Sequence, residues 1–297
     1  DEDFVEHMIN LSTHDYILFF TDKGKVYRLK GYEIPEFSRQ SKGIPIVNLL
    51  QVEKDERVNA VIQISREENS KYLLFATEGG VVKKTLISEF DNIRNSGKIC
   101  ISLRENDKLI GVKKTSGNDL VLLGSEAGRM VKFNEDEIRV MGRTASGVRG
   151  ISLDGSKCIC SEIVKEDDTI LLVTEKGYGK QTKVSEYRQT KRGSKGVKAM
   201  NITEKNGNLV SVKIVYEGKE LVIMTNSGMT MRMPLDQISV LGRVTQGLRL
   251  INLKDNQKVS TISLVDKPEE EPSQENIEES ESVAQNGAEI TENIEAE

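Results

Sequence analysis

A basic loop that contains glycine is the stretch of this sequence whose residues best suit a chemical task. It reads YRQTKRGSKG over residues 187–196, with the cations Lys191, Arg192 and Lys195 beside Gly193 and Gly196. Glycine allows a backbone to turn sharply and to approach another chain closely. Flanking cations would then meet phosphate oxygens at short range. The loop therefore favours contact with a polyanion, whereas the plainer interpretation of one basic loop is solvated surface.

The sequence shows no arrangement that is typical of catalysis or metal binding. His7 and His14 have no partner pattern, and Cys158 and Cys160 lie in an apolar run without a second cysteine pair. Together with Cys100 they make an odd count, which argues against a disulfide framework and fits a reducing compartment. No phosphate-binding P-loop motif is present. We expect no catalytic residue, no metal site and no cofactor in this chain.

Charge is divided unevenly along the 297 residues. The whole chain has a formal charge of −5, yet residues 266–297 hold 12 acidic residues and one basic residue. Residues 1–265 consequently carry about +6, which favours a polyanionic partner. The acidic segment has two prolines and no aromatic residue, so we predict a disordered tail that either aids solubility or competes for the basic body. No apolar run approaches the roughly 20 residues that a membrane helix needs.

Five copies of one pattern run from residue 16 to residue 265. Each copy opens with a short apolar run, continues with Thr or Ser, and reaches a glycine three residues later. These glycines, at 24, 80, 128, 177 and 228, are spaced 56, 48, 49 and 51 residues apart. A period of this size indicates a repeat architecture.

Each copy predicts a small antiparallel sheet. The apolar run and the next alternating run would form a hairpin, with the glycine at positive φ in its turn. A second glycine follows 17 or 19 residues later, and two further strand-like runs come after it. Four short strands per repeat are typical of a β-propeller blade.

The first residues extend this pattern toward the N-terminus. Residues 3–12 match the fourth strand of a blade, and the chain starts at Asp1 without Met. We therefore predict an all-β, six-bladed β-propeller of four-stranded blades whose first blade is truncated. The predicted boundaries are a blade remnant at 1–12, five repeats at 13–265 and the tail at 266–297.

Cations recur near the second glycine of every repeat. The candidate phosphate-binding side chains near it are Arg39, Lys42, Arg94, Lys98, Arg143, Arg149, Lys191, Arg192, Lys195, Arg243 and Arg249, and the backbone would approach closely at Gly193 and Gly196. Lys84, four residues after the first glycine of its repeat, is a further candidate. Equivalent positions of a propeller lie at one radius, so we expect a belt of cations around its rim. Such a track suits a bent duplex held through its phosphates, without base readout. No recognition helix for base readout is predicted.

Residues 13–50, the run MGRTASGVRGI at 141–151 and the blade pattern together resemble the C-terminal domain of the DNA gyrase A protein, over about residues 1–265. The resemblance implies a β-pinwheel, a propeller whose neighbouring blades exchange a strand, with duplex DNA wrapped around its outer edge. It implies a part in ATP-dependent negative supercoiling by a type II topoisomerase of the bacterial cytoplasm, at the nucleoid.

The resemblance also implies partners and the place of the chemistry. The expected assembly is a homodimer of the gyrase A protein with two copies of the gyrase B protein, and ATP and Mg²⁺ would act in the gyrase B protein. The nucleophilic tyrosine would lie upstream in the gyrase A protein. The family's basic seven-residue box belongs to the first blade and is missing here. Residues 190–196, TKRGSKG, are its nearest match, with Thr190 in place of the glutamine.

Two alternatives remain beside this interpretation. The equivalent domain of topoisomerase IV has the same kind of repeats, although five regular repeats favour gyrase. A protein-binding propeller of the WD40 or kelch type belongs to another functional class. The sequence has no tryptophan, which argues against both of those propeller types.

Overall fold

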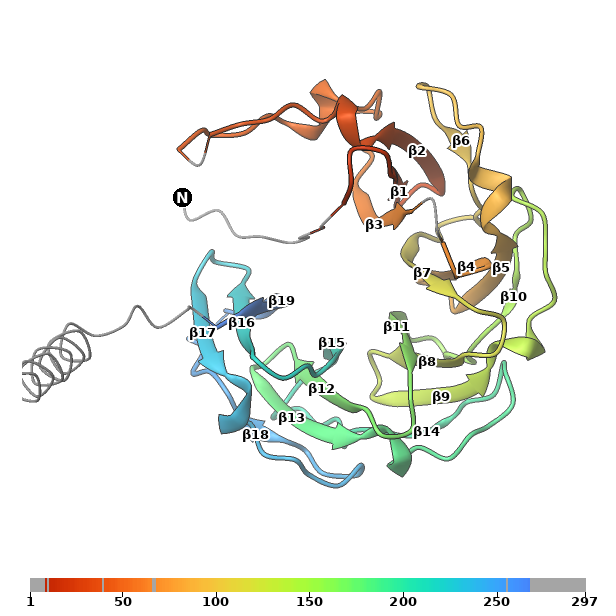
Figure 1. Ribbon diagram of the computed structural model, residues 1–297. Coiled ribbons are helices and arrows are strands. Elements are labelled where there is room, and N and C mark those ends of the chain that lie inside the picture. The colour runs from red at the N-terminus through yellow and green to blue at the C-terminus, as the bar shows by residue number, and fades with distance from the viewer. Residues whose placement is uncertain (1–8, 10, 39, 66–67, 255, 268–297) are drawn as a thin grey trace, which may run out of the picture.

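The computed structural model describes residues 9, 11–38, 40–65, 68–254 and 256–267. In this part of the chain, β-strands and short 3₁₀ helices form the regular structure, and there is no α-helix. No helix of the described residues is long and apolar enough to cross a membrane. The strands form five sheets, which stand around an open arc (Figure 1). The all-β propeller architecture is therefore confirmed.

Every repeat opens with an antiparallel hairpin. The hairpins are β1 (Tyr16–Thr21) with β2 (Lys25–Lys30), β4 (Tyr72–Thr77) with β5 (Val81–Leu86), β8 (Leu120–Ser125) with β9 (Arg129–Asn134), β12 (Thr169–Thr174) with β13 (Tyr178–Lys183), and β16 (Lys219–Thr225) with β17 (Thr230–Pro234). The first strand of each of the first four pairs is buried along nearly its whole length. The apolar runs of the sequence thus lie at the centre of the sheets, as a buried strand requires.

The repeated hydroxyl residue closes the hairpin turn. In the second repeat, the Thr77 carbonyl accepts a hydrogen bond from the Gly80 N–H at 2.9 Å, and Thr77 Oγ1 accepts one from the Val81 N–H at 3.2 Å. Gly80 has φ of 75°, a conformation that glycine adopts without steric cost. The same side-chain bond recurs at Thr21, Ser125, Thr174 and Thr225. The predicted glycine turn is confirmed in all five repeats.

The last strand of each repeat lies nearest the centre of the arc. These inner strands are β3 (Val58–Ile64), β7 (Leu109–Thr115), β11 (Cys158–Val164), β15 (Leu209–Ile214) and β19 (Val259–Asp266). Each pairs with the first hairpin strand and shifts register at one β-bulge, at the same place in every repeat. Neighbouring inner strands contact one another from β3 through β19. The bulge adds local twist, which helps the strands to converge around the arc.

The outermost strand of a sheet is donated by the following repeat. These outer strands are β6 (Lys98–Ile99), β10 (Val148–Arg149), β14 (Val197–Lys198) and β18 (Leu248–Arg249). The first sheet has the order β3-β1-β2-β6, so a strand of the second repeat completes the first blade, and the next three sheets follow suit. The strand exchange implied by the family resemblance is confirmed. The second to fifth repeats therefore each contribute strands to two blades.

The prediction of six blades is wrong for this chain. The described residues form four sheets of four strands and a fifth sheet, β17-β16-β19, of three strands. The fifth sheet has no outer strand among the described residues, whereas each of the other sheets receives that strand from the following repeat. Most of the predicted remnant at 1–12 lies outside the described residues, and its residues 9, 11 and 12 form no strand. Residues 268–297 of the predicted tail also lie outside them.

The first repeat shows what the outer strand depends on. The strand-like run that follows its second glycine, residues 44–50, instead contains the 3₁₀ helix η2 (Ile46–Asn48). Val47 occupies the place held in later repeats by Ile101, Ile151, Met200 and Ile251, which are at most 6% exposed, yet Val47 is 59% exposed. No hairpin precedes this repeat among the described residues, so its segment extends from the first blade at the opening of the arc (Figure 1). Packing against a preceding hairpin therefore creates the outer strand.

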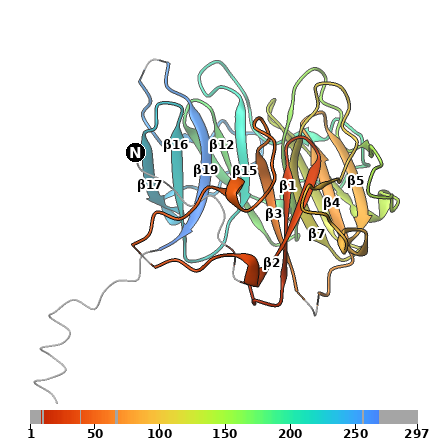
Figure 2. The same cartoon turned by 90° about the horizontal axis from the view of Figure 1, so that it is seen from above.

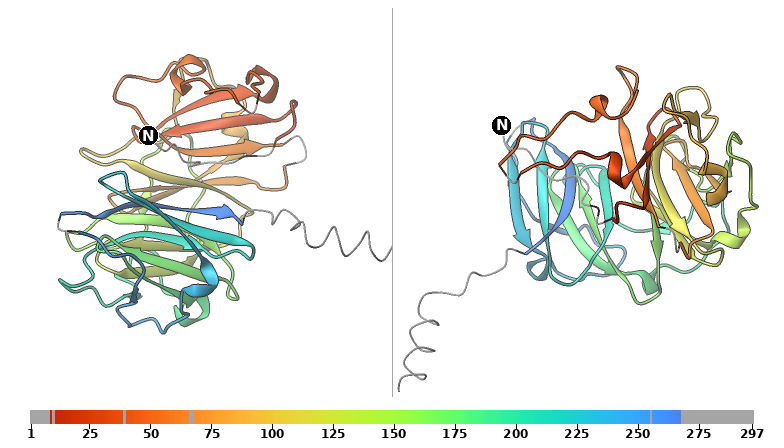
Figure 3. Two further views of the ribbon diagram at one scale, coloured as in Figure 1. Left: turned by 90° about the vertical axis from the view of Figure 1, so that its left-hand side faces the viewer. Right: turned by 45° about the horizontal axis from the view of Figure 1, so that its top comes forward.

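The hydrophobic core lies between neighbouring blades. Phe20 of the first blade and Phe75 of the second meet edge to face with ring centroids 5.5 Å apart, and Phe90 lies 5.9 Å from both. All three side chains are buried. Similar clusters fill the spaces between the later blades, and Figures 2 and 3 show the sheets stacked beside one another. A blade is therefore stabilised mainly by its neighbours.

Substitutions at equivalent positions of two repeats should differ in how much they destabilise the protein, because only one of the two positions lies beside a donated strand. Ile151→Ala should lower the free energy of unfolding by about 2–4 kcal/mol, because the Ile151 side chain is buried and its removal leaves a cavity. Val47→Ala should cost less than about 0.5 kcal/mol, because Val47 is exposed. Urea unfolding followed by circular dichroism measures both values. Equal losses would show that the outer strand does not depend on packing against the preceding hairpin.

Candidate nucleic-acid interface

The predicted basic loops follow the outer side of the arc. Arg94 precedes β6, Arg143 precedes β10, Arg192 and Lys195 precede β14, and Arg243 precedes β18. These four strands lie at the periphery of the ring in Figure 1, whereas the inner strands face its centre. The loops therefore meet one curved edge, which we call the rim. Arg39 lies outside the described residues.

Three arginines hold the rim by the same contact. Nη1 of Arg143 donates to the Ile99 carbonyl, Nη1 of Arg192 donates to the Arg149 carbonyl, and Nη1 of Arg243 donates to the Lys198 carbonyl. Each acceptor is the second residue of an outer strand. Each arginine therefore links its own loop to the outer strand of the preceding repeat. The guanidinium keeps further N–H donors for an incoming acceptor.

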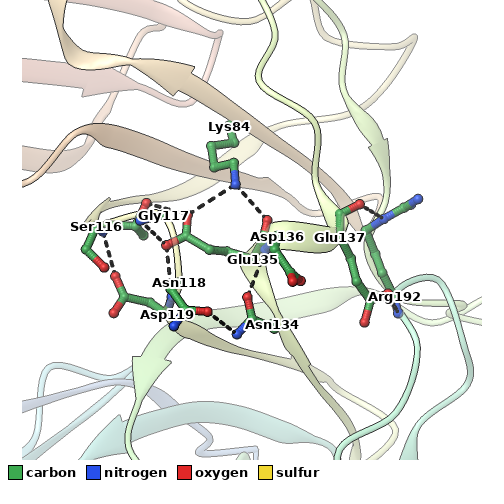
Figure 4. A network of polar contacts seen from close by, with 11 residues as sticks. Lys84, Ser116, Gly117, Asn118, Asp119, Asn134, Glu135, Asp136, Glu137 and Arg192 are labelled. Carbon is green, nitrogen blue, oxygen red and sulfur yellow. Dashed lines mark hydrogen bonds and ion pairs between the residues drawn. The ribbon is translucent and has the colours of Figure 1, made fainter.

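Two glutamates anchor the backbone of these loops. The 3₁₀ helix η4 (Glu135–Glu137) places Glu137 Oε2 2.9 Å from the backbone nitrogen of Arg192. The helix η5 (Val184–Glu186) places Glu186 Oε2 2.8 Å from the backbone nitrogen of Arg243. Figure 4 shows Glu137 directed toward Arg192 on one side of η4, while Glu135 points into the protein on the other.

Two buried lysines on hairpin strands, Lys83 on β5 and Lys180 on β13, hydrogen-bond to the loops at 141–149 and 241–249. Nζ of Lys83 donates to the carbonyls of Cys100 and Arg143, the latter at 2.5 Å. Nζ of Lys180 donates to the carbonyls of Gly242 and Arg243 at 2.8 and 2.7 Å. Burial lowers the pKa of each lysine to about 8. An ammonium group thus ties each of these two loops to the hairpin on which it rests.

The loop at 187–196 borders a shallow hollow of about 650 Å³ on the rim. The hollow is lined by Glu137, Arg188, Gln189, Thr190, Lys191, Ser194, Lys195 and Gly196. Arg129 fixes one wall, because its Nε and Nη2 donate to the carbonyls of Lys195 and Gly196 at 2.9 and 2.8 Å. The Lys195 ammonium lies 2.7 Å from Asp154 and lowers the pKa of that carboxyl. Lys191 and Lys195 are both exposed to solvent.

Lys84 is a correction to the predicted set of rim cations. Its side chain is only 4% exposed, and its ammonium donates to the Glu135 carbonyl at 2.8 Å and lies 3.6 Å from the Glu135 carboxylate. That carboxylate also accepts hydrogen bonds from Thr115 and from the Gly117 N–H (Figure 4). The pair joins the second blade to the third. Lys84 therefore holds blades together and does not face a ligand.

The two glycines of the basic loop lie against protein backbone. A Cβ on Gly196 would stand 2.0 Å from the Met130 carbonyl oxygen, and Gly196 has φ of 63°. The Gly193 N–H donates to the Gly150 carbonyl at 2.7 Å. Glycine is thus required at 196 for the close approach of this loop to the preceding hairpin. Contact of either glycine with a nucleic acid stays a prediction.

The remaining candidate cations differ in solvent exposure and in whether another residue holds the charged group. Lys42, Arg94 and Arg149 are exposed. Lys98 is half-buried, and its ammonium donates to the Asn92 carbonyl. The guanidinium of Arg249 is held by the Tyr178 hydroxyl at 2.9 Å and by Asn252 at 3.2 Å. Lys98 and Arg249 are therefore held by protein acceptors, whereas Lys42, Arg94 and Arg149 are exposed.

Sequence reasoning did not assign the residues that hold the loops in place. The candidate cations predicted from the sequence do not include Lys83, Arg129 or Lys180, and Glu137 and Glu186 carry no motif that marks them. One signal was available, since the runs at 141–149 and 241–249 share two glycines and two arginines at the same positions. A lysine also lies three residues after the first glycine of the preceding repeat in both cases.

The described residues show no arrangement for metal chemistry. No group of three or more His, Cys, Asp or Glu side chains among them is placed to hold a metal ion. The three cysteines are buried, and burial raises the pKa of Cys100 and Cys158 to about 12. The chemistry that the rim does offer is that of cationic donors along a curved edge.

Comparisons with known proteins agree on one family. The sequence model described as DNA gyrase C-terminal domain, beta-propeller, matches residues 15–65, 71–116, 119–159, 168–215 and 219–266. The DNA gyrase A protein of Staphylococcus epidermidis is 46% identical over 274 residues, which cover 91% of this chain and 31% of that protein. The DNA gyrase A protein of Staphylococcus aureus MRSA252 is 46% identical over 293 residues, which cover 97% of this chain and 33% of that protein. The chain spans about a third of the length of these relatives.

Solved structures with the same fold include two domains of bacterial topoisomerases. The crystal structure of the C-terminal domain of DNA topoisomerase IV matches with a TM-score of 0.79 and 25% identity, over 86% of this chain and 80% of that one. The structure of the DNA gyrase A C-terminal domain matches with a TM-score of 0.71 and 25% identity, over 86% of this chain and 83% of that one.

The buried lysines predict a pH-dependent stability. The folded protein releases the Lys180 proton near pH 8, whereas an unfolded lysine keeps its proton up to about pH 10.4. The unfolded state binds more protons between these values, so this lysine makes the free energy of unfolding rise with pH there. The stability of the unsubstituted protein relative to Lys180→Met should therefore increase from pH 8 to 10, by up to about 1.4 kcal/mol for each pH unit. Denaturant unfolding at pH 7, 9 and 10 measures this difference, and a flat or falling difference would contradict it.

Proposed function

The chain belongs to the DNA gyrase C-terminal domain family, and on this premise we propose that its rim binds duplex DNA without sequence specificity and wraps it. One observation carries the proposal: basic loops from four successive repeats meet the same curved edge, directly beside the outer strands. A bent duplex brings its phosphates to such an edge at intervals. Phosphate contacts supply affinity without reading the sequence.

The distribution of the cations suits the energetics of bending. Duplex DNA has a persistence length of about 150 base pairs, so bending around a small domain costs several kcal/mol. Contacts spread over several blades offset that cost, whereas a single patch would only hold a straight duplex. The loops are also held firmly, since Arg143, Arg192 and Arg243 each bond an outer-strand carbonyl. Little additional ordering is then required when DNA binds.

The wider role follows from the relatives. We propose that the chain acts as part of the DNA gyrase A protein, in a homodimer joined by two copies of the DNA gyrase B protein. The wrapped duplex would be presented for strand passage, so that ATP hydrolysis with Mg²⁺ in the gyrase B protein introduces negative supercoils. The proposed location is the bacterial cytoplasm, at the nucleoid.

A second candidate is the corresponding domain of topoisomerase IV. The observation that favours it is the TM-score of 0.79 with the topoisomerase IV domain, against 0.71 with the gyrase domain. The sequence comparison favours gyrase, because the gyrase A proteins of two staphylococci are 46% identical to this chain. A protein-binding propeller has no comparable support.

Removing two exposed rim cations should weaken DNA binding. Lys191→Ala combined with Lys195→Ala deletes two side chains that are exposed and make no contact with the outer-strand carbonyls. We expect the dissociation constant for a 40-base-pair duplex to rise by about tenfold, and the salt dependence of log K to become shallower by about 1.8, since each phosphate contact contributes about 0.9. Fluorescence anisotropy over a range of salt concentrations measures both.

A matched control deletes two lysines from the opposite side of the sheets. Lys113→Ala combined with Lys213→Ala changes the inner strands β7 and β15. This variant should keep the affinity and the salt dependence of the unsubstituted protein. If both variants lose affinity equally, net charge alone explains binding and the rim has no special role.

Wrapping is tested separately from binding. Nicked circular DNA is incubated with the protein, ligated and deproteinised, and the linking number is read from its gel mobility. We expect a change in linking number that grows with protein concentration and is smaller for the rim variant. Tight binding with no change in linking number would contradict wrapping.

A further inference from the structure

We propose that Glu137 and Glu186 are positioning residues that strengthen DNA binding, although both carry negative charge on the rim. This inference rests on the proposed function. Each glutamate fixes the backbone of a loop whose arginine is a candidate for phosphate contact. The expected effect is opposite in sign to the one that their charge alone would produce.

The two glutamates hold equivalent places in successive repeats. Each is the third residue of the 3₁₀ helix that follows a hairpin, η4 or η5. Each accepts a hydrogen bond from the backbone N–H of an arginine in the next repeat, at 2.9 Å for Arg192 and 2.8 Å for Arg243. Because the same contact occurs at two equivalent places, it is a feature of the repeat and not of one loop.

The contact spares the charge of the arginine. The carboxylate bonds the backbone N–H, and neither guanidinium forms an ion pair with any described residue within 4.0 Å. The guanidinium of Arg192 bonds only neutral carbonyls among the described residues, from Nη1 to Arg149 and from Nε to Glu137 at 3.2 Å. If the carboxylate instead formed a salt bridge with the guanidinium, it would compete with a phosphate for the same N–H donors. This geometry fixes the arginine and leaves it cationic.

Fixing the loop lowers the entropic cost of binding. A free loop must be ordered when its arginine meets a phosphate, and that ordering subtracts from affinity. Glu137 and the Arg149 carbonyl instead hold Arg192 at its backbone and at its tip before DNA arrives. Against this, a carboxylate within a Debye length of a phosphate repels it. The sign of the change after substitution shows which effect dominates.

The experiment compares three single substitutions by DNA-binding titrations with a 40-base-pair duplex at one salt concentration. Glu137→Ala removes both the charge and the acceptor, and should raise the dissociation constant about threefold to tenfold. Glu137→Gln removes the charge but keeps an amide oxygen that can accept from the Arg192 N–H, so its affinity should equal or exceed that of the unsubstituted protein. Asp136→Ala removes a charge one residue away, from an exposed side chain without a partner among the described residues, and should not weaken binding.

A second measurement follows the loop in the absence of DNA. Hydrogen exchange at the Arg192 amide should become faster in Glu137→Ala and stay slow in Glu137→Gln, while thermal unfolding reports whether each variant is folded. Glu186→Ala repeats the test at Arg243 if the first variant does not fold. Equal or tighter DNA binding by folded Glu137→Ala would overturn the inference and leave the proposed function intact. Failure of the unsubstituted protein to bind DNA would overturn the proposed function together with the inference.

Discussion

The structure depends on the donation of one short strand from each repeat to the hairpin before it. Only two residues of the strand pair with the hairpin, but they bring a glycine into close contact with the neighbouring backbone and seat an apolar side chain against the hairpin turn. In the third repeat, Gly147 lies against the Val82 carbonyl and Ile151 against Gly80. The first and fifth blades show what happens where this donation is missing among the described residues. Among the described residues, no hairpin lies beside the segment around Val47, which stays exposed, and no donated strand joins the three strands of the fifth sheet.

This donation also explains where the basic loops lie. A loop that leads into a donated strand must cross from its own blade to the edge of the preceding one, so every such loop reaches the outside of the arc. In three of these loops an arginine then donates to a carbonyl of the preceding outer strand, as Arg143, Arg192 and Arg243 do. The features that hold the blades together therefore also present the cations. The proposed wrapping of DNA and the stability of the rim share the same residues, which is why exposed lysines such as Lys191 are better probes of binding than these arginines.

Charged residues in the repeats perform two different tasks that composition cannot separate. Lys83, Lys84 and Lys180 are buried and bond carbonyl oxygens of neighbouring segments. A buried ammonium is tolerated only because these acceptors surround it. Lys191 and Arg149 are exposed and can meet an anion, whereas Lys195 is exposed but pairs with Asp154 at 2.7 Å. The net positive charge of residues 1–265 therefore overstates the charge available on the rim.

The repeat, the hairpins and the turns could all be predicted from the amino-acid sequence, because they depend on local patterns of residues. Five apolar runs followed by a hydroxyl residue and a glycine leave little choice of backbone, and the hydrogen bonds of Thr77 and its equivalents show why. Blade number and the roles of individual cations were decided only by the tertiary structure. Residues 44–50 have the pattern of a strand, but no described strand lies beside them to pair with. Lys84 was predicted to be a surface cation, yet its ammonium pairs with the buried carboxylate of Glu135. The structure at each position depends on a contact with another repeat, about 50 residues away in the chain for Lys84 and Glu135. The local sequence does not show which residue of that repeat lies opposite.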